Sequence, residues 1–450
     1  MTSVNNTLNN LLNEKLKIQP STSLSIDKSI NDLKNNFKLI NKIEKRKKIL
    51  LSLRKFLLKN KKYFIKLINL EVFKTIDESK GEFDYAIEFI DYSLKTLKNY
   101  NFEIINNKNR SIFVKSTGLV FAITPYNDPL AGMIRKIAPS IAAGSPIIVK
   151  TSSYNLKICK FFDIFLTKEL NKIIKFVFIK DKKIINKIIQ NKQIKIVTFT
   201  GSTEIGLKIN SVPTNHLQKK ILELGGINYA IITNKYNLNK IVEEILIRKI
   251  KAAGQACSSI NKIFVDKKIK KDFEIILKDK VRKLICGSIR KNIQPNFGPV
   301  ISNKHYKFLL KLKNLLSKKN KLITESKNLN NTSNLFPLTI FNVSFDDEIF
   351  DKYETFGPLL GVNYYSNEKK LMNKISSSNY SLVCYIYTKS KKFIDFSKNL
   401  NFGSIGINTT KIQSPGSPTG GNDLSGIGRE GGIWGFEEFL STVNYVKEKI

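Results

Sequence analysis

The sequence predicts an α/β fold in two or three domains, and three observations support this prediction. The chain has 450 residues, which exceeds the usual domain length of about 100–150 residues. Its first hundred or so residues have helical periodicity, and strands then alternate with helices. One buried strand ends in a lysine at Lys150 and another runs into a glycine turn at Gly201, which is the βαβ rhythm of a parallel sheet.

The segment from Met1 to about Lys98 is predicted to be helical. Apolar residues recur three and four positions apart, with polar residues between them, in 33–37, 49–53 and 83–90. Two β-rich runs follow, at 110–115 and 118–124, and the short polar turn between them predicts a pair of strands.

Leu130 to Ala143 predicts a helix that stops at Gly144. The run from Pro146 to Lys150 is then typical of a buried parallel strand. Ligands of open α/β sheets bind beyond the carboxyl ends of the strands, so we expect Lys150 and the residues after it to hold a cofactor ribose. Without this context Lys150 would be one solvated lysine among many.

Ile194 to Thr200 predicts a further strand, and the turn from Gly201 to Gly206 leads from it into a helix. The N–H groups at the start of that helix would face a passing diphosphate. The spacing of these glycines differs from GxGxxG. Taken alone, a glycine turn between a strand and a helix is more often a connecting turn that binds no ligand.

Cys257 is the most informative residue of the chain. A thiol is intrinsically nucleophilic, and with a carboxylate partner it can form a covalent adduct with a carbonyl. Glu223 would supply that base and Asn127 a donor to the oxyanion, which together fit an acyl-enzyme mechanism. Taken singly, Cys257 could equally be a small buried hydrophobe, Glu223 a surface acid beside a Gly-Gly turn, and Asn127 a turn residue flanked by prolines.

Five motifs, in one order, resemble the aldehyde dehydrogenase superfamily in its NAD(P)-dependent, non-acylating type. They are Thr200-Gly-Ser-Thr-Glu-Ile-Gly206, Glu223-Leu-Gly-Gly226, Gly254-Gln-Ala-Cys257, Glu354-Thr-Phe-Gly-Pro358 and Ser425-Gly-Ile-Gly-Arg-Glu430. The similarity runs from about Leu119 to about Val446. It implies a Rossmann-like dinucleotide-binding domain (1–97 and 117–225), an α/β catalytic domain (226–432) and a small β oligomerisation element (98–116 and 433–450). It also implies a homodimer or homotetramer, in which the C-terminal stretch adds to a sheet of a neighbouring subunit.

The resemblance implies a role for each site residue. Cys257 attacks the aldehyde carbonyl, the Asn127 side chain and the Cys257 N–H hold its oxygen, a hydride leaves for the nicotinamide, and Glu223 activates water against the thioester. The segment Arg429-Glu430 is expected to serve structure rather than chemistry. The residues implied to bind the cofactor are Lys150, Ser153, Gly201, Ser202, Gly206, Glu354 and Phe356.

The cofactor is expected to be NAD or NADP. NAD-preferring relatives carry a glutamate three residues after the lysine, where it would hydrogen-bond the ribose hydroxyls. Ser153 stands at that position here and removes a charge that would repel a 2′-phosphate. We therefore expect use of NADP or of both cofactors.

The substrate is expected to be a small hydrophilic or anionic aldehyde, such as lactaldehyde, a semialdehyde or glyceraldehyde 3-phosphate. The resemblance places Asp128, Ala131, Gly132 and Arg135 along the substrate tunnel, where relatives acting on apolar aldehydes carry bulky aromatics. The planar guanidinium of Arg135 has the geometry to donate paired hydrogen bonds to a carboxylate or phosphate. The alternative is that Arg135 is a helix-surface residue beside Lys136.

Composition bears on several other function classes. The net charge is +39, but only eight of the 76 basic residues are arginines and the lysines are spread throughout. A nucleic-acid site should concentrate arginine and aromatics, so no specific nucleic-acid partner is expected. Four cysteines without CxxC spacing and two histidines predict no metal site. Without an h-region or an apolar run of about 20 residues, we expect no membrane span, and a reduced, cytoplasmic enzyme.

Three alternatives remain open. The thioester could be released to coenzyme A instead of water, as in acylating relatives, although Glu223 favours hydrolysis. The chain could be a non-catalytic, degenerate family member, although the presence of Asn127, Lys150, Glu223, Cys257 and Glu354 argues against this. It could bind nucleic acid through its charge, in which case it should retain oligonucleotides at low salt.

Overall fold

The computed structural model describes residues 19–107, 109–234, 236–288, 295–329 and 334–448, so the predicted domain ranges extend in part outside the described residues. The predicted N-terminal helices are confirmed within this range. They are α2 (Ser23–Asn35), α3 (Ile43–Lys59), α4 (Lys61–Val72) and α5 (Ile76–Asn99). The expected helical run 33–37 is interrupted, because α2 ends at Asn35 and a 3₁₀ turn begins at Phe37. Asparagine competes for backbone hydrogen bonds and favours such helix ends.

A six-stranded sheet forms the core of the first body, with the strand order β19-β7-β6-β3-β4-β5. Its neighbours are parallel except for β19, which pairs antiparallel with β7. The predicted strands at 118–124, 146–150 and 194–200 are all present. The strands are β3 (Leu119–Ile123), β4 (Ile147–Lys150), β5 (Ile174–Val177), β6 (Ile194–Thr200), β7 (Lys219–Glu223) and β19 (Gly426–Ile427).

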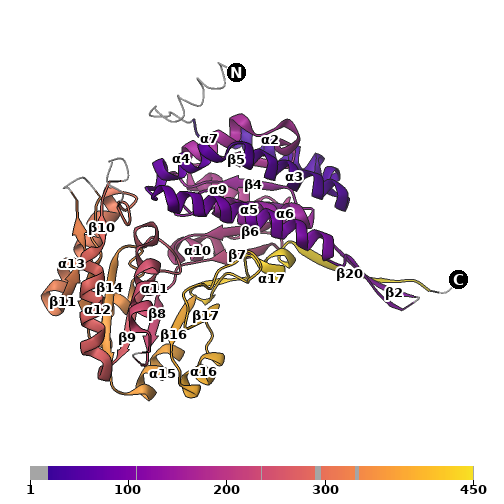
Figure 1. The fold of residues 1–450 in the computed structure, drawn as a ribbon. Helices are drawn as coiled ribbons and strands as arrows, with labels where there is room; N and C mark the ends of the chain where they lie inside the picture. The colour runs from indigo at the N-terminus through magenta and orange to yellow at the C-terminus, as the bar shows by residue number, and fades with distance from the viewer. Residues whose placement is uncertain (1–18, 108, 235, 289–294, 330–333, 449–450) are drawn as a thin grey trace.

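Helices cover both faces of this sheet (Figure 1). One face packs against α3 to α7, and the other against α2, α9 and α10, each through a separate apolar cluster. The predicted helix ending at Gly144 is α6, whose C-cap glycine has the left-handed φ of 88° that favours glycine. The remaining helices here are α6 (Ala131–Ala143), α7 (Leu156–Phe165), α8 (Lys168–Asn171), α9 (Lys182–Gln190) and α10 (Thr203–Asn210).

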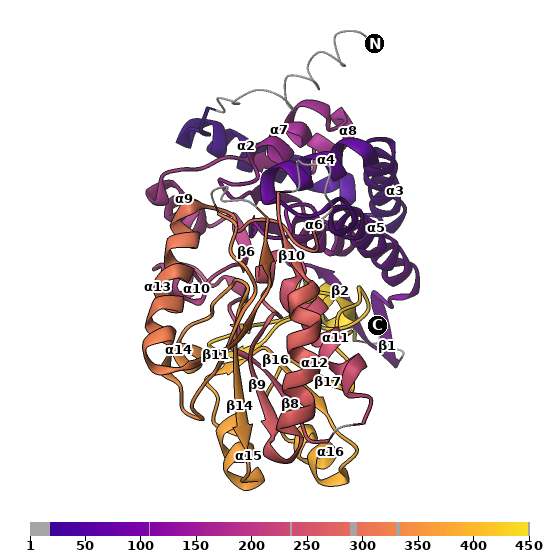
Figure 2. The same cartoon turned by 60° about the vertical axis from the view of Figure 1, so that its left-hand side comes forward.

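A second, seven-stranded sheet has the order β11-β13-β14-β9-β8-β16-β17 and is parallel except for its edge strand β11. Figure 2 shows it beneath the first body. Its strands are β8 (Asn228–Ile232), β9 (Ile260–Asp266), β11 (Lys321–Glu325), β13 (Thr339–Asn342), β14 (Leu359–Tyr365), β16 (Val383–Tyr387) and β17 (Ser404–Ile407). Its helices are α11 (Leu238–Ile250), α12 (Lys270–Lys283), α13 (Asn303–Lys319), α14 (Glu348–Lys352), α15 (Glu368–Ser376) and α16 (Lys391–Lys398).

A three-stranded antiparallel sheet projects from the body as an arm (Figure 1). It joins β1 (Glu103–Asn107), β2 (Arg110–Ser116) and β20 (Leu440–Val446), and α17 (Gly432–Glu437) leads into it. Strand β20 is an edge strand whose outer apolar residues Val443, Tyr445 and Val446 are exposed. Two short pairs complete the strands: β10 (Ile285–Cys286) with β12 (Lys327–Asn328), and β15 (Tyr380–Ser381) with β18 (Asn422–Asp423).

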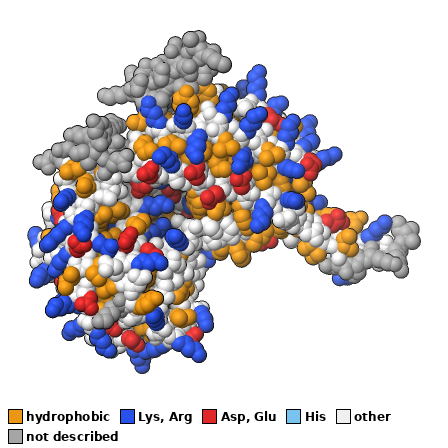
Figure 3. Space-filling view, viewed as in Figure 1, with side chains coloured by type: hydrophobic (Ala, Val, Ile, Leu, Met, Phe, Trp, Pro, Cys, Tyr) orange, Lys and Arg blue, Asp and Glu red, His pale blue; other side chains and the backbone are white. Residues whose placement is uncertain are grey.

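Several further properties bear on the sequence expectations. None of the helices in the described part of the chain is long and apolar enough to cross a bilayer. All four cysteines are free thiols. On the face seen in Figure 3, lysine and arginine are scattered and interleaved with acidic side chains rather than gathered on one element.

Candidate active site

The site lies where the parallel strands of the first sheet end. Strand β3 leads to Asn127, β6 to Gly201 and Ser202, and β7 ends at Glu223. Carboxyl ends of parallel strands share one edge of a sheet, which is why segments far apart in sequence meet here. They border a cavity of about 390 Å³. Seven of the predicted site residues line it, namely Asn127, Arg135, Gly201, Ser202, Cys257, Glu354 and Phe356.

Four predicted residues lie around this cavity without lining it. Lys150 ends β4, beside β3, and burial lowers the pKa of its ammonium group. Ser153 is exposed in the loop that follows. Gly206 lies buried in α10, where an added Cβ would be 2.2 Å from Leu224 Cδ2, so this glycine permits α10 to pack closely on the segment after β7. Glu223 directly precedes the lining residues Leu224 and Gly225.

The Cys257 loop has an unusual backbone. Ala252 and Ala253 have φ values of 51° and 55°, in the left-handed region that L-residues other than glycine rarely adopt. Gly254 follows with φ 76°, and a Cβ there would lie 2.5 Å from the carbonyl carbon of Gly357. On the other side of the nucleophile, Asn228 Nδ2 donates to the Cys257 carbonyl at 2.6 Å. The Cys257 loop is therefore fixed on both sides.

The surroundings of Cys257 favour the protonated thiol. Burial raises its pKa, and the charge of Glu223 raises that pKa further. Because the thiolate is the reactive form, this cysteine needs a base or a nearby positive charge to react. Arg135 and Arg248 favour the thiolate, because their positive charges oppose the rise in the thiol pKa.

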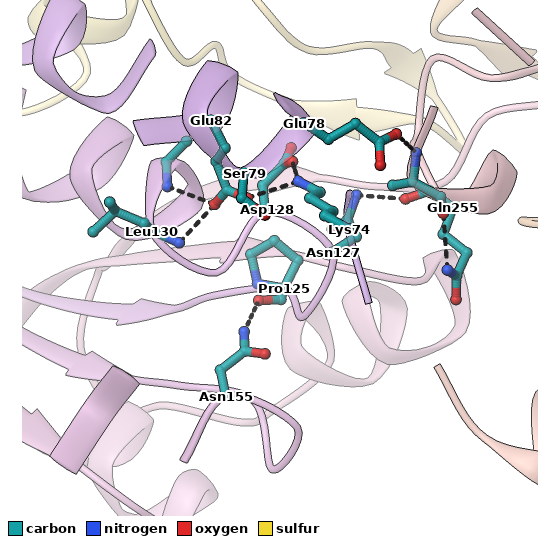
Figure 4. A network of polar contacts seen from close by, with 12 residues as sticks. Lys74, Glu78, Ser79, Glu82, Pro125, Asn127, Asp128, Leu130, Asn155 and Gln255 are labelled. Carbon is teal, nitrogen blue, oxygen red and sulfur yellow. Dashed lines mark hydrogen bonds and ion pairs between the residues drawn. The ribbon is translucent and has the colours of Figure 1, made fainter. Parts of the chain in front are cut away.

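The Asn127 amide points at the same loop. Its Nδ2 donates to the Gln255 carbonyl at 2.9 Å, as Figure 4 shows. A carboxamide has two N–H donors, so one remains available to an oxygen in the cavity. Gln255 is itself held, because its Oε1 accepts from the Tyr126 hydroxyl at 3.1 Å and from the Ile301 N–H at 2.9 Å. Asn127 is therefore placed relative to the nucleophile loop by a direct contact.

Glu223 belongs to a buried cluster of charges. Its side chain is 1% exposed, and neither carboxylate oxygen has a hydrogen-bond partner among the described atoms. Arg135 Nη2 lies 3.9 Å from Glu223 Oε2, and Arg135 Nε lies 3.2 Å from Glu430 Oε2. Lys136 Nζ bonds Glu430 Oε1 and, at 2.8 Å, Thr198 Oγ1. The cluster joins α6, β6 and β7 to the segment after β19.

The cluster sets the proton affinity of Glu223. Burial raises the pKa of Glu223 to about 7, the charge of Glu430 adds to the rise, and Arg135 opposes it. Burial acts to raise the pKa of Glu430 as well, but the charges of Lys136 and Arg135 together outweigh it and hold that pKa below the ordinary value. One carboxylate of the pair thus stays ionised while the other titrates near neutral pH, where a general base is most effective.

The cluster also settles one alternative from the sequence. The interpretation of Arg135 as a surface residue beside Lys136 is wrong, because the two side chains are only 3% and 1% exposed and both are paired with Glu430. No local pattern indicated that Lys136 belongs to this cluster, or that Lys74, Glu78 and Glu82 make contacts near the site. The Thr75-x-x-Glu78 capping-box pattern was the one signal that could have pointed to this region.

The cofactor side of the cavity combines two glycines with the carboxylate of Glu354. A Cβ on Gly225 would lie 2.4 Å from Glu354 Oε2, so glycine is needed for this approach. Glu354 Oε1 is buried without a hydrogen bond in the part of the chain that the structure describes. Burial raises the pKa of Glu354 to about 8. Gly201 also lines the cavity, just before Ser202, the N-cap residue of α10. These groups fit a nicotinamide dinucleotide, whose ribose hydroxyls and diphosphate need such partners.

Phe356 is held in a left-handed conformation, with φ 43°. Its carbonyl accepts from His305 Nε2 at 2.8 Å, and its ring makes an edge contact with Tyr126 at 5.9 Å between centroids. Strained non-glycine residues cluster at ligand sites. Both His305 and Phe356 line the 390 Å³ cavity.

A second cavity, of about 560 Å³, adjoins the first. Asp128 and Arg135 line both, and Ala131 lines the second. Gly132 does not, since a Cβ there would face Pro125 at 3.2 Å. The lining of the second cavity is rich in charged residues and contains one aromatic side chain, Tyr85. This cavity is large and its lining is mostly polar, and its role as the substrate tunnel stays a prediction.

The sequence matches the family described as "Aldehyde dehydrogenase family" over residues 12–445. The chain belongs to the aldehyde dehydrogenase family. It is therefore an NAD(P)-dependent oxidoreductase, and the expected aldehyde dehydrogenase-like α/β fold is confirmed.

Similar proteins extend this assignment. A lactaldehyde dehydrogenase from Methanococcus maripaludis is 30% identical over 426 residues, covering 90% of this chain and 88% of that protein. A succinate semialdehyde dehydrogenase from Acinetobacter baylyi is 31% identical over 397 residues, covering 84% and 82%. The crystal structure of the glyceraldehyde-3-phosphate dehydrogenase GapN from Methanocaldococcus jannaschii, complexed with NADP, superposes with a TM-score of 0.88 at 27% identity, covering 97% of this chain and 96% of that one.

Proposed function

We propose that the protein oxidises a small hydrophilic or anionic aldehyde to its carboxylic acid with NAD or NADP, through a covalent intermediate on Cys257. The observation that carries this proposal is the meeting of Cys257 and Asn127 on one cavity, with Glu223 immediately before the lining residues Leu224 and Gly225 and without a hydrogen-bond partner among the described residues. A nucleophile, an oxyanion donor and a base are the parts that acyl transfer through a thioester requires.

In the first step Cys257 Sγ bonds to the aldehyde carbon, the carbonyl π bond opens, and the thiol proton ends on the former carbonyl oxygen, which gives a thiohemiacetal. The free N–H of Asn127 and the backbone N–H of Cys257 donate to the oxygen as its negative charge grows. Such a donor is worth about 2.7–4 kcal/mol, so the Asn127 amide accounts for roughly 10²–10³ in turnover. When bound, the nicotinamide would accept the hydride that leaves the thiohemiacetal carbon, and with loss of the hydroxyl proton the adduct on Cys257 becomes a thioester.

In the second step Glu223 takes a proton from water, which attacks the thioester on Cys257 and releases the acid. Neither oxygen of Glu223 has a hydrogen-bond partner among the described residues, so each keeps its capacity to accept a hydrogen bond from water. Its pKa of about 7 suits proton transfer at neutral pH. Lys150, Glu354 and Phe356, with the α10 turn at Gly201 and Ser202, would hold and orient the dinucleotide.

Ser153 supports use of NADP or of both cofactors. It is exposed three residues after Lys150, and it carries no charge that would repel a 2′-phosphate. The similar M. jannaschii structure contains NADP. Measuring kcat/KM with NAD and NADP tests this preference, and strict use of NAD would contradict it.

The second cavity supports a hydrophilic or anionic substrate. Arg135 lies where the two cavities meet, although Glu430 and Glu223 offset part of its charge. The same wall carries charges of both signs: Arg248, Lys251 and Lys411 are basic, Glu78, Glu88 and Glu244 are acidic, and Glu82 and Asp128 are each paired with Lys74 at 2.7 Å. A carboxylate or phosphate could be held by Arg248, Lys251 and Lys411. The names of the relatives, lactaldehyde and succinate semialdehyde dehydrogenase, lie within this range.

The experiment is to follow reduced nicotinamide with a panel of neutral and anionic aldehydes, with NAD or NADP and without coenzyme A. Cys257→Ala should abolish turnover, while Cys159→Ala, at a buried thiol outside both cavities, should retain it. A folded wild type that binds cofactor but turns over only with coenzyme A would favour the acylating alternative. A wild type silent under both conditions would favour the non-catalytic one.

The domain division and the assembly are part of the same proposal. We place a dinucleotide-binding domain at 1–97 and 117–225, a catalytic domain at 226–432, and an oligomerisation element at 98–116 and 433–450. The exposed apolar edge of β20 supports self-association of this arm into a homodimer or homotetramer. The free thiols, with Cys257 as nucleophile, suit a reducing compartment such as the cytoplasm. No specific nucleic-acid partner is proposed.

A further inference from the structure

Helix α5 presents two glutamates to the active site. Glu78 and Glu82 are four residues apart and so lie on one face of the helix. Glu78 is fixed by a capping box, since its Oε2 accepts the Thr75 N–H at 2.8 Å and its own N–H donates to Thr75 Oγ1 at 3.2 Å. Its other oxygen, Oε1, is directed away from the helix and accepts the Ala252 N–H at 2.7 Å.

Ala252 is the first left-handed residue of the nucleophile loop. A non-glycine residue in this region costs about 1–3 kcal/mol and persists only where its surroundings hold it. Side chains hold both polar groups of the Ala252 backbone: Glu78 accepts from its N–H, and Gln255 Nε2 donates to its carbonyl at 2.8 Å. Cys257 follows within the same loop. Glu78 therefore stabilises the strained entry to the nucleophile.

Glu82 holds the loop that carries Asn127, as Glu78 holds the loop that carries Cys257. Its Oε1 accepts the N–H groups of Leu130 and Ala131, at 2.8 and 3.1 Å, where α6 begins. These donors have no partner within their own helix, and a carboxylate is favoured at this end. Glu82 Oε2 accepts from Lys74 Nζ at 2.7 Å, and Lys74 bonds Asp128 at 2.7 Å (Figure 4).

We propose that Glu78 and Glu82 are positioning residues for the reaction, because they tie the nucleophile loop and the oxyanion-donor loop to one helix. Helix α5 then sets the spacing between Cys257 Sγ and the Asn127 amide, and the Asn127–Gln255 contact at 2.9 Å closes the arrangement. Misplacement of reacting groups by 1 Å can cost about 10²-fold in rate. This inference rests on the proposed roles of Cys257 and Asn127.

The positioning role of Glu78 is tested by comparing Glu78→Ala with Thr75→Ala. Thr75→Ala weakens the same helix end by about 1 kcal/mol but leaves the carboxylate on Ala252, so it controls for stability. Two rates are measured in each: kcat for the aldehyde, and alkylation of Cys257 by iodoacetamide, followed by mass spectrometry of its peptide.

In Glu78→Ala the two rates should move in opposite directions. We expect kcat to fall at least about tenfold as the loop leaves its reactive position. Alkylation should become faster, because a loosened loop hydrates the thiol and removes the burial that raises its pKa. Hydrogen exchange of the Ala252 amide should also accelerate. Unchanged kcat, alkylation and exchange in Glu78→Ala, or the same changes in Thr75→Ala, would overturn the proposal.

Substitution of Glu82 should change kcat and the alkylation rate in a different way. Glu82→Gln should lower kcat about tenfold without changing the alkylation rate, since displacement of iodide creates no oxyanion for Asn127 to hold. If Glu82→Gln does not fold, Glu82→Asp replaces it, because this variant keeps the charge beside Lys74 but withdraws the carboxylate from α6. A wild-type kcat in the folded Glu82 variant would overturn the positioning role of Glu82. The alkylation and exchange rates remain measurable even if no aldehyde is oxidised, so failure of the proposed function would be seen separately.

Discussion

Replacing Glu223 by Gln should stop turnover after one chemical step. The carboxamide keeps the size of the side chain but cannot take a proton from water, so the thioester on Cys257 would form and then persist. General-base catalysis contributes about 10²–10⁴ in rate, and we expect the steady-state rate to fall within that range. A rapid-mixing experiment should show a burst of reduced nicotinamide close to the enzyme concentration, followed by a slow phase.

The wild-type pH profile gives the same group a second test. A carboxylic acid is protonated below its pKa and cannot act as a base there, so raising the pKa of Glu223 from its ordinary value to about 7 moves the acid limb of kcat to neutral pH. Roughly a tenth of the Glu223 carboxyl is ionised at pH 6 and roughly nine tenths at pH 8, so kcat should rise about tenfold over this interval.

The control for this limb is Glu348→Gln, which removes an exposed glutamate paired with Lys352. It should leave the limb in place. A profile that is flat from pH 6 to pH 8 in the wild type, or a Glu223→Gln enzyme with the wild-type steady-state rate, would refute the assignment of Glu223 as the base.

Three further predictions address other parts of the site. Glu430→Gln removes the negative charge that raises the pKa of Glu223, so the acid limb of kcat should move to lower pH; a limb that stays or moves upward would contradict this. Gly254→Ala should lower the melting temperature, because its φ of 76° and the backbone of Gly357 exclude a Cβ, whereas Gly81→Ala, with open space in helix α5, should raise it. Ser153→Glu should raise the ratio of kcat/KM for NAD over NADP by repelling the 2′-phosphate, and an unchanged ratio would remove Ser153 from the cofactor site.

Local patterns were sufficient for the elements that build the site. The strands at 118–124, 146–150 and 194–200 are marked by short apolar runs, and the helix ending at Gly144 by a C-cap glycine, because each signal depends on a few adjacent residues. The family motifs then indicated Asn127 and Cys257, and the structure brings both to one cavity.

The charge cluster could not be predicted in the same way. Arg135 and Lys136 stand together on a helix, which by pattern is as consistent with a solvated face as with a buried site. Their partner Glu430 lies 294 residues beyond Lys136, and only the tertiary fold brings the charges together. The link from Glu78 to Ala252 spans 174 residues. The capping box explains one oxygen of Glu78, but no local signal indicates where the other is directed.

The most direct test of the account is to identify the covalent intermediate. Glu223→Gln enzyme would be mixed with aldehyde and NADP, quenched in acid and digested, and each cysteine peptide weighed. We predict an acyl adduct on the Cys257 peptide, formed in step with the burst of reduced nicotinamide, and none on the peptides of Cys159, Cys286 or Cys384. Continued aldehyde oxidation by Cys257→Ala, with no acyl adduct on Cys257 in the Glu223→Gln enzyme, would contradict it.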